Sequence, residues 1–293
     1  MVIQEIISGL AMGSIYALVS FGFVLVYNAA GAVNFAHGEL VMFGGYFGLI
    51  ATSWMHLPLW VAFLFSLVAM AGLGIVFNRV AYYPMRHRPA VTVIIATIGM
   101  GILLRNSALA LFGPDPVKLK SFLGDRILTM GGTGGGIVIP QHHLLIIAVT
   151  IALFIGQSLF FSRTSIGRRL EATAQDQETA RLMGINVNRM ITLTFVLSAL
   201  LASIAGFLLG PIWFLDPDVG LIVILKAFIV IVIGGFGSIR GMLAGGLFLG
   251  VVEVLVASHL TSEYRDVISF LILIAVLVVL PRGFFGEKVA QKV

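Results

Sequence analysis

Residues 57–77 read LPLWVAFLFSLVAMAGLGIVF, a run of 21 residues without a charged side chain. A helix that crosses the hydrocarbon core of a bilayer, roughly 30 Å thick, needs about 20 mostly apolar residues. The run therefore has the length and the composition of a membrane span. A buried helix of a soluble protein would explain one such run, but similar runs recur along the chain. We therefore expect the chain to lie in a membrane.

The composition of the whole chain supports this interpretation. Of its 293 residues, 59% are hydrophobic and 11% are charged, whereas a soluble domain averages about 45–50% apolar and about 25% charged residues. The chain contains no cysteine, which excludes disulfides, thiolate nucleophiles and cysteine-ligated metals. An ordinary soluble protein is therefore excluded.

Nine apolar stretches have the character of membrane helices: 6–27, 35–53, 57–77, 91–112, 143–161, 190–209, 221–235, 242–257 and 267–280. The last three are short, so one of them, or the glycine-rich second stretch, could be a broken or re-entrant helix. The first stretch lacks a basic n-region and a small-residue cleavage site, so we expect it to be a span rather than a removed signal peptide. The sequence thus predicts an all-α, polytopic membrane protein with eight or nine spans, forming one transmembrane domain over 1–293.

Lysine and arginine are distributed unevenly between the two sides of this predicted topology. Cytoplasmic loops carry the excess of these residues. With nine spans, one side holds twelve of them: Arg79, Arg86, Arg88, Arg163, Arg168, Arg169, Arg181, Arg189, Arg240, Arg282, Lys288 and Lys292. The opposite side holds four: Lys118, Lys120, Arg126 and Arg265. We expect the amino end outside and the carboxyl end inside, so the net charge of +5 is a topology signal and requires no nucleic acid.

The segment 162–189 is a long polar loop on the predicted cytoplasmic side. It contains a partial apolar stripe of Ile166, Leu170, Ala174, Leu182 and Met183. Gly184 stands where a helix would need a left-handed residue just after its end, and Asn186 or Asn188 could cap the next helix. This pattern predicts a short surface helix, a sharp turn and the start of a span.

The same loop carries the first of several resemblances to a known family. Residues 178–184, ETARLMG, resemble the Glu-Ala-Ala-x-x-x-Gly coupling motif of bacterial ABC importer permeases, with Thr179 in place of the middle alanine and no Leu-Pro ending downstream. NFAHGEL at 34–40, ARLMGIN at 180–186, and KAF at 226–228 running on to GGFGSI at 234–239 extend the likeness. Over nearly its whole length the chain resembles the H-type permease of the high-affinity branched-chain amino acid transporters.

This resemblance implies one subunit of a larger machine in the bacterial inner membrane. Its partners would be a second permease chain, two cytoplasmic ATPases and an external substrate-binding protein. The cytoplasmic loop would couple it to the ATPases through Glu178, Ala180, Arg181, Leu182, Met183 and Gly184. The chain has no Gly-x-x-x-x-Gly-Lys-Ser/Thr phosphate loop, so we expect ATP hydrolysis on the separate subunits and no enzymatic activity or cofactor here.

Three other functions compete with a branched-chain amino acid permease as interpretations of the sequence. The same superfamily also serves urea and short amides, so the resemblance fixes the family better than the substrate. A self-contained secondary transporter or channel would be expected to show buried acid pairs or an ion-coordinating broken helix, and the intramembrane acids here are few and scattered. An intramembrane enzyme would need a paired nucleophile and base or metal ligands.

Ionisable side chains inside membrane spans are costly and are functional candidates by default. His37, Glu39, Arg105, Lys226 and Glu253 meet this criterion. We take five residues for a translocation path: Asn34, His37, Glu39, Lys226 and Glu253. The first three stand at the start of the second stretch, where a capping role is an equal alternative. Lys226 either snorkels outward or pairs with Glu253. The spacing of His37 and Glu39 does not fit a His-Glu-x-x-His site, so we expect no metal.

The external segment 113–142 is too long for an idle connection. Residues 126–130 and 137–140 form two short runs around six residues of which five are glycine, Gly131 to Gly136. This pattern is typical of a hairpin. The segment is either a docking platform for the binding protein or a flexible loop.

Overall fold

The computed structural model describes residues 2–124, 126–130, 137–280 and 283–285. The chain is mostly helical. Its elements are α1 (Val2–Ala30), α2 (His37–Leu49), α3 (Leu59–Phe77), α4 (Ala90–Phe112), β1 (Ile127–Met130), β2 (Ile137–Pro140), α5 (Gln141–Arg163), α6 (Ser165–Gln175), α7 (Gln177–Leu182), α8 (Val187–Leu209), α9 (Val219–Gly234), α10 (Ile239–His259) and α11 (Tyr264–Val279).

Each of the nine apolar stretches corresponds to a helix, the second one to α2 together with the π-helix Ile50–Trp54, and extends beyond it by at most two residues at either end. Not every one of these helices is long enough to be counted as a span. Within the described residues, six helices are long and apolar enough to cross a membrane: α1, α3 with its extension to Met85, α4, α5, α8 and α10. Helices α2, α9 and α11 have 13, 16 and 16 residues. A total of eight or nine spans therefore stays a prediction.

Local sequence signals explain where the helices begin. Pro58 and Pro89 immediately precede α3 and α4 in an extended conformation, as expected where proline cannot donate a helix hydrogen bond. Ser238 accepts a hydrogen bond from the backbone N–H of Gly241 at the start of α10. The glycine-rich second stretch does not break: α2 continues directly into a π-helix over Ile50–Trp54.

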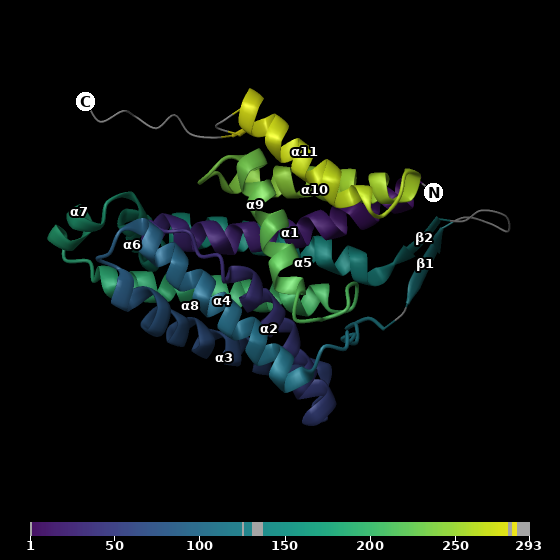
Figure 1. Cartoon of the computed structure of the whole chain (residues 1–293), viewed down its shortest axis with the longest axis horizontal. Coiled ribbons are helices and arrows are strands. Elements are labelled where there is room, and N and C mark those ends of the chain that lie inside the picture. Colours follow the sequence, from purple (N-terminus) through teal and green to yellow (C-terminus); the bar gives the residue numbers. More distant parts are fainter. Residues whose placement is uncertain (1, 125, 131–136, 281–282, 286–293) are drawn as a thin grey trace. The chain divides into compact units, whose positions relative to one another are not determined.

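The contacts divide the chain into two compact units. Unit 1 comprises residues 1–21, 123–151 and 225–293, and unit 2 comprises 22–122 and 152–224. In unit 2, α2, α3 and α8 pack against one another (Figure 1). A side chain on Gly44 of α2 would meet the Cα of Ser203 in α8 at 2.6 Å. Small residues thus allow the close backbone approach by which membrane helices associate.

Unit 1 uses the same device between α1 and α10. A side chain at Gly9 or Gly13 of α1 would collide with the backbone of α10, and one at Gly246 or Gly250 with the backbone of α1. Helix α11 packs against α10. By contrast, a side chain at Gly72 or Gly99 would meet open space. These two glycines therefore do not serve helix packing within this chain.

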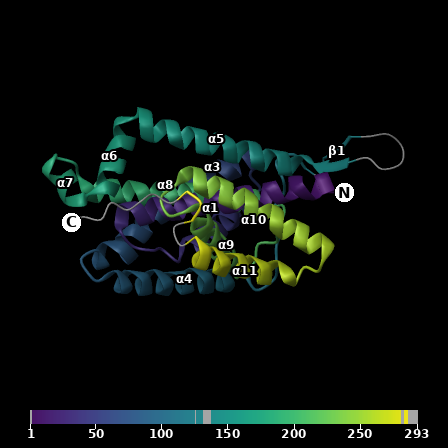
Figure 2. The same ribbon diagram turned by 90° about the horizontal axis from the view of Figure 1, so that it is seen from above.

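The two strands also belong to unit 1. They pair antiparallel, with Ile127 opposite Pro140 and Thr129 opposite Val138, and β2 leads directly into α5 (Figure 2). The expected pairing is confirmed, and it is the one departure from an all-α fold among the described residues. The glycines of 131–136 lie outside the described residues, and docking of a binding protein on this segment stays a prediction.

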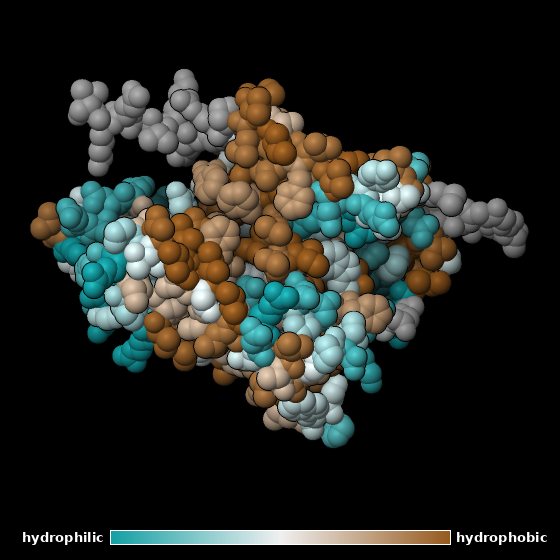
Figure 3. Space-filling view, viewed as in Figure 1, coloured by the Kyte–Doolittle hydropathy of each residue, from teal (hydrophilic) through white to brown (hydrophobic). Residues whose placement is uncertain are grey.

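Large apolar side chains cover much of the surface. On α4 the exposed residues include Val91, Ile95, Ile102, Leu103 and Leu111. Figure 3 shows hydrophobic side chains gathered over α11 and hydrophilic ones over α7. Contiguous exposed apolar surface of this extent is unfavourable in water. It is the surface expected of helices that face lipid.

Candidate functional site

The predicted cytoplasmic loop folds as two short helices, not one. Asp176 separates α6 from α7 because its backbone is extended (φ −156°, ψ 110°). Its carboxylate accepts hydrogen bonds from the backbone N–H groups of Glu178 and Thr179 at 2.9 and 3.1 Å. An aspartate at a helix start satisfies N–H groups that lack partners within the helix. The prediction of a single helix was therefore wrong, because this acid begins a second one.

The end of α7 has the turn that the sequence predicted. Gly184 is left-handed, with φ of +77°. Its N–H donates to the carbonyl of Arg181, and the N–H of Ile185 donates to the carbonyl of Ala180, each at 3.0 Å. This pair of bonds is the Schellman motif. Asn186 then caps α8 by accepting from the N–H of Arg189 at 3.1 Å.

Helices α6 and α7 are held firmly on the rest of unit 2. Leu170 and Ala180 are buried, and the Nε2 of Gln177 donates to the carbonyl of Ala29 at 2.8 Å. Gly167 lies against the backbone of Phe160 and Phe161. The two helices, with the turn to Asn186, therefore form one fixed element, which we call the coupling element (residues 165–186).

Two of the predicted stripe residues point to solvent. Leu182 is 88% exposed and Met183 is 78% exposed, whereas Leu170 on α6 is buried. The expectation of one shared stripe was wrong, since the break at Asp176 turns α7 onto a different face. Two apolar side chains presented on a fixed helix end are suited to a partner's groove.

The predicted path residues of unit 2 stand at the start of α2. Asn34 is buried, and its Oδ1 accepts from the N–H of Ala36 at 3.1 Å. This bond forms a turn before the helix, and Ala36 at the cap position provides no side-chain bond. The Nδ1 of His37 lies 3.1 Å from the hydroxyl of Ser198, and Gly22 leaves room for the imidazole. Among the described residues, no three histidine or carboxylate side chains converge as a metal site.

Glu39 has an unusual environment. It is buried in the first turn of α2, where a negative charge is favoured by the helix terminus. Its Oε2 has no hydrogen-bond partner among the described residues, and the same holds for the Nδ2 of Asn34. Buried polar atoms usually have partners. We call Asn34, His37 and Glu39 the first-turn cluster. It therefore contains one acceptor, Oε2 of Glu39, and one donor, Nδ2 of Asn34, that have no hydrogen-bond partner among the described residues.

The predicted path residues of unit 1 have a different environment. Lys226 of α9 and Glu253 of α10 are 2% and 3% exposed, and their Nζ and Oε1 atoms lie 2.6 Å apart. The expected pair is present, and the alternative of an outward-snorkelling lysine was wrong. A third partner, Asp266, was not predicted from the sequence. Its Oδ1 lies 2.7 Å from the ammonium of Lys226.

Hydroxyl groups complete this unit 1 charge cluster. The hydroxyl of Tyr16 donates to Oε2 of Glu253 at 2.9 Å, and that of Ser269 lies 2.6 Å from Oε1. The ammonium of Lys226 also donates to Ser269 at 3.1 Å. Both oxygens of Glu253 are thus bonded, in contrast to Glu39. Sequence reasoning missed Tyr16 and Ser269, because a lone hydroxyl in an apolar run signals a buried hydrogen bond but not its partner.

Arg105 is not a buried intramembrane charge. It forms an ion pair with Asp218 in unit 2, and both side chains are about half exposed. An exposed pair of this kind contributes about 0–1 kcal/mol. The segment around Asp218 is also tied to the predicted external loop, since Leu215 and Val117 exchange backbone hydrogen bonds at 2.7 and 2.9 Å.

Comparisons with known proteins show the family of this chain. Residues 5–277 match the family described as the permease component of branched-chain amino acid transport systems. The chain is 37% identical to the high-affinity branched-chain amino acid transport system permease protein BraD of Pseudomonas aeruginosa, covering 99% of this chain and 98% of that one. It is 36% identical to the corresponding protein LivH of Escherichia coli K12, covering 99% and 97%.

A solved structure shares the fold. PsaBC from Streptococcus pneumoniae, in complex with Fab, matches with a TM-score of 0.50 and 14% sequence identity, covering 95% of this chain and 91% of that one. The identity is too low to carry more than the fold. The family match and the full-length relatives carry the assignment, and this chain belongs to the permease family of the branched-chain amino acid transport systems.

Proposed function

We propose that this chain is the membrane-embedded subunit of an ABC importer that carries branched-chain amino acids into a bacterial cell. The observation that carries the proposal is the coupling element: a capped pair of helices that is anchored by the buried Leu170 and Ala180 and whose end presents Leu182 and Met183 to solvent. A transporter that hydrolysed no ATP itself would need such a rigid contact to receive motion from an ATPase. Family membership and the relatives named BraD and LivH support the same function.

The proposal divides the work among several chains. Two separate ATPases hydrolyse ATP and engage residues 178–184 from the cytoplasm. A second permease subunit completes the path, and an external binding protein delivers the substrate. A permease of this kind needs only a site that binds the amino acid weakly, because the binding protein provides most of the substrate recognition.

The first-turn cluster suits a weak site for an amino acid. Such a substrate brings an ammonium and a carboxylate, and each needs a partner when it leaves water. The unpartnered Oε2 of Glu39 can accept from an ammonium, and the unpartnered Nδ2 of Asn34 can donate to a carboxylate. We therefore place Asn34, His37 and Glu39 on the path, and we assign Lys226 and Glu253 to structural support of unit 1.

The proposal includes an orientation, with the amino end outside and the carboxyl end inside. It is supported by the twelve basic residues on one set of loops against four on the other. Cysteines introduced singly at the exposed positions Lys120 and Gln175 should react from opposite sides with a membrane-impermeant maleimide, Lys120 from outside. Labelling of both from one side would contradict the orientation.

Competition for uptake tests the substrate. Cells that lack their own branched-chain importers should take up labelled leucine when this chain is expressed with its partner subunits. An excess of unlabelled isoleucine or valine should reduce that uptake at least tenfold, while urea and acetamide leave it unchanged. Inhibition by urea or acetamide instead would assign the chain to the urea and amide branch of the superfamily.

A further inference from the structure

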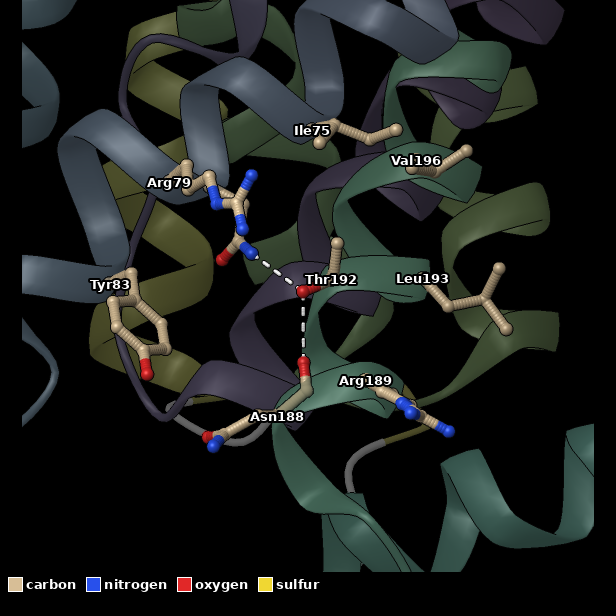
Figure 4. Close-up of a pocket in the computed structure, with 9 residues that line it drawn as sticks. Ile75, Arg79, Tyr83, Asn188, Arg189, Thr192, Leu193 and Val196 are labelled. Carbon is tan, nitrogen blue, oxygen red and sulfur yellow. Dashed lines mark hydrogen bonds between the residues drawn. The ribbon is translucent and has the colours of Figure 1, made fainter.

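A groove in unit 2 begins just after the coupling element and is lined by none of the path residues. It lies between the end of α3 and the start of α8 and encloses about 560 Å³. Figure 4 shows its lining, with Ile75 and Val196 at one end and Asn188 and Arg189 at the other. The proposed function gives this groove no role.

The groove changes character along its length. Ile75 of α3 is followed four residues later by Arg79 of the π-helix Asn78–Tyr82 that continues α3. On α8, Arg189 is followed by Leu193 and Val196. Residues at these spacings share one face of a helix. Both walls are therefore apolar toward the middle of their helices and basic toward the ends. A lipid at the surface of a membrane is arranged in the same way, with its apolar chains toward the membrane interior and its polar headgroup toward the boundary.

The basic end carries an uncompensated charge. Arg79 and Arg189 are both exposed, and neither has an ion-pair partner among the described residues. The described residues that line the groove include no acidic side chain. Guanidinium groups bind phosphate through paired hydrogen bonds. Two of them on facing helices favour an anionic group between them.

Asn78 adds a second, independent feature. Asn78 lines the groove and is only 4% exposed. Its Nδ2 donates to the hydroxyl of Thr192 at 2.8 Å, and that hydroxyl donates to the carbonyl of Asn188 at 2.9 Å. These bonds fix the amide, and its Oδ1 is buried with no hydrogen-bond partner in the described part of the chain. Within the described part of the chain, the arginines therefore lack an anion and the Oδ1 of Asn78 lacks a donor.

We propose that the groove binds an anionic phospholipid with a hydroxylated headgroup, of the phosphatidylglycerol type. The phosphate lies between Arg79 and Arg189, and a headgroup hydroxyl donates to Oδ1 of Asn78. One acyl chain follows Ile75, Leu193 and Val196. Basic pockets between membrane helices are suited to anionic headgroups. The inference requires a membrane-embedded chain and is independent of the transported substrate.

Native mass spectrometry of the full chain in detergent tests the proposal. The chain is titrated with dioleoyl phosphatidylglycerol, with dioleoyl phosphatidylcholine and with the soluble headgroup analogue glycerol 3-phosphate. We expect one phosphatidylglycerol to bind at least tenfold more tightly than phosphatidylcholine. Replacing both arginines (Arg79→Gln with Arg189→Gln) should weaken it about 30-fold, since each contributes about a factor of five near an anionic lipid.

Two further variants separate the alternatives. Val196→Trp fills the apolar end without changing charge and should also weaken phosphatidylglycerol binding. The control pair, Arg163→Gln with Arg168→Gln, removes the same charge from exposed positions outside the groove and should change binding less than threefold. A melting curve of each variant verifies that it is folded.

Three results would overturn the proposal. If the control pair weakens binding as much as the groove pair, the arginines only attract lipid nonspecifically. If glycerol 3-phosphate binds as tightly as the lipid and Val196→Trp has no effect, the site takes a free phosphate. If lipid binding survives the groove pair but association with the ATPase subunits is lost, the groove is a protein contact.

Discussion

The two groups of buried polar residues differ in how completely they are paired. In unit 1, Glu253 has partners on both oxygens, from Lys226, Tyr16 and Ser269. In unit 2, Glu39 is also buried, but its Oε2 has no partner among the described residues. Sequence alone ranked the two glutamates equally, since both are acids within apolar stretches.

The difference indicates what each group does. A buried ion pair whose hydrogen bonds are all made offers no free group to a ligand, and removal of one partner leaves the other charge uncompensated. A buried carboxylate with a free acceptor is costly to the fold and is retained where a ligand supplies the partner. We therefore propose that the unit 1 charge cluster supports the structure and that the first-turn cluster serves transport.

The largest expected effect is on the stability of unit 1. Lys226→Met leaves the carboxylate of Glu253 buried without its cation, which should lower the free energy of unfolding by roughly 3–5 kcal/mol. The change should appear as a lower melting temperature and a lower yield of inserted protein. The second replacement, Glu253→Met in the same chain, should recover most of the loss.

Arg105→Gln is the matched control for an ion pair, because its partner Asp218 is half exposed. It should cost about 1 kcal/mol or less. Equal losses from Lys226→Met and Arg105→Gln would break the distinction between a buried and an exposed pair.

The next effect is on transport through unit 2. Glu39→Gln keeps the shape of the side chain, and no hydrogen bond within the described fold is lost with Oε2, so the melting temperature should change little. Leucine uptake per inserted molecule should fall about tenfold or more, because a charge-assisted hydrogen bond to the ammonium contributes roughly 1.5–3 kcal/mol. Glu263→Gln, at an exposed position just before α11, should leave uptake unchanged. Normal uptake in the Glu39 variant would remove this residue from the path.

A smaller loss of stability than that of Lys226→Met is expected at the coupling element. Gly184→Val places a β-branched residue at φ +77° and should cost about 1–2 kcal/mol, enough to misdirect the start of α8. Leucine uptake and the ATP hydrolysis linked to it should both fall while the chain still inserts. Gly72→Val, where a side chain meets open space, is the control and should transport normally. If the Gly184 variant still couples uptake to ATP hydrolysis, this segment is an ordinary surface loop.

The helical framework was largely predictable from sequence, because its signals are local. The stretch 57–77 became α3 (Leu59–Phe77) and 190–209 became α8 (Val187–Leu209), since length and apolar composition suffice to identify a membrane helix. The turn at Gly184 was predictable for the same reason. A left-handed residue and the cap that follows it lie within a few positions of each other.

Features that depend on distant partners were not predictable. The hydroxyl of Tyr16 reaches Glu253 across 237 positions, and no local pattern encodes that contact. The exposure of Leu182 and Met183 depends on the carboxylate of Asp176 starting a new helix. The groove beside Asn78 also went unnoticed, because its arginines were counted only as topology signals.

Uptake by the assembled transporter in proteoliposomes tests the central claim most directly. Labelled leucine and loaded binding protein are placed on the external side and ATP on the side of the ATPase subunits. Those subunits are either intact or substituted at the lysine of their phosphate loop. The account predicts ATP-dependent accumulation with the intact subunits and none above the ATP-free level with the substituted ones. Equal accumulation with both would contradict it and would identify a self-contained transporter.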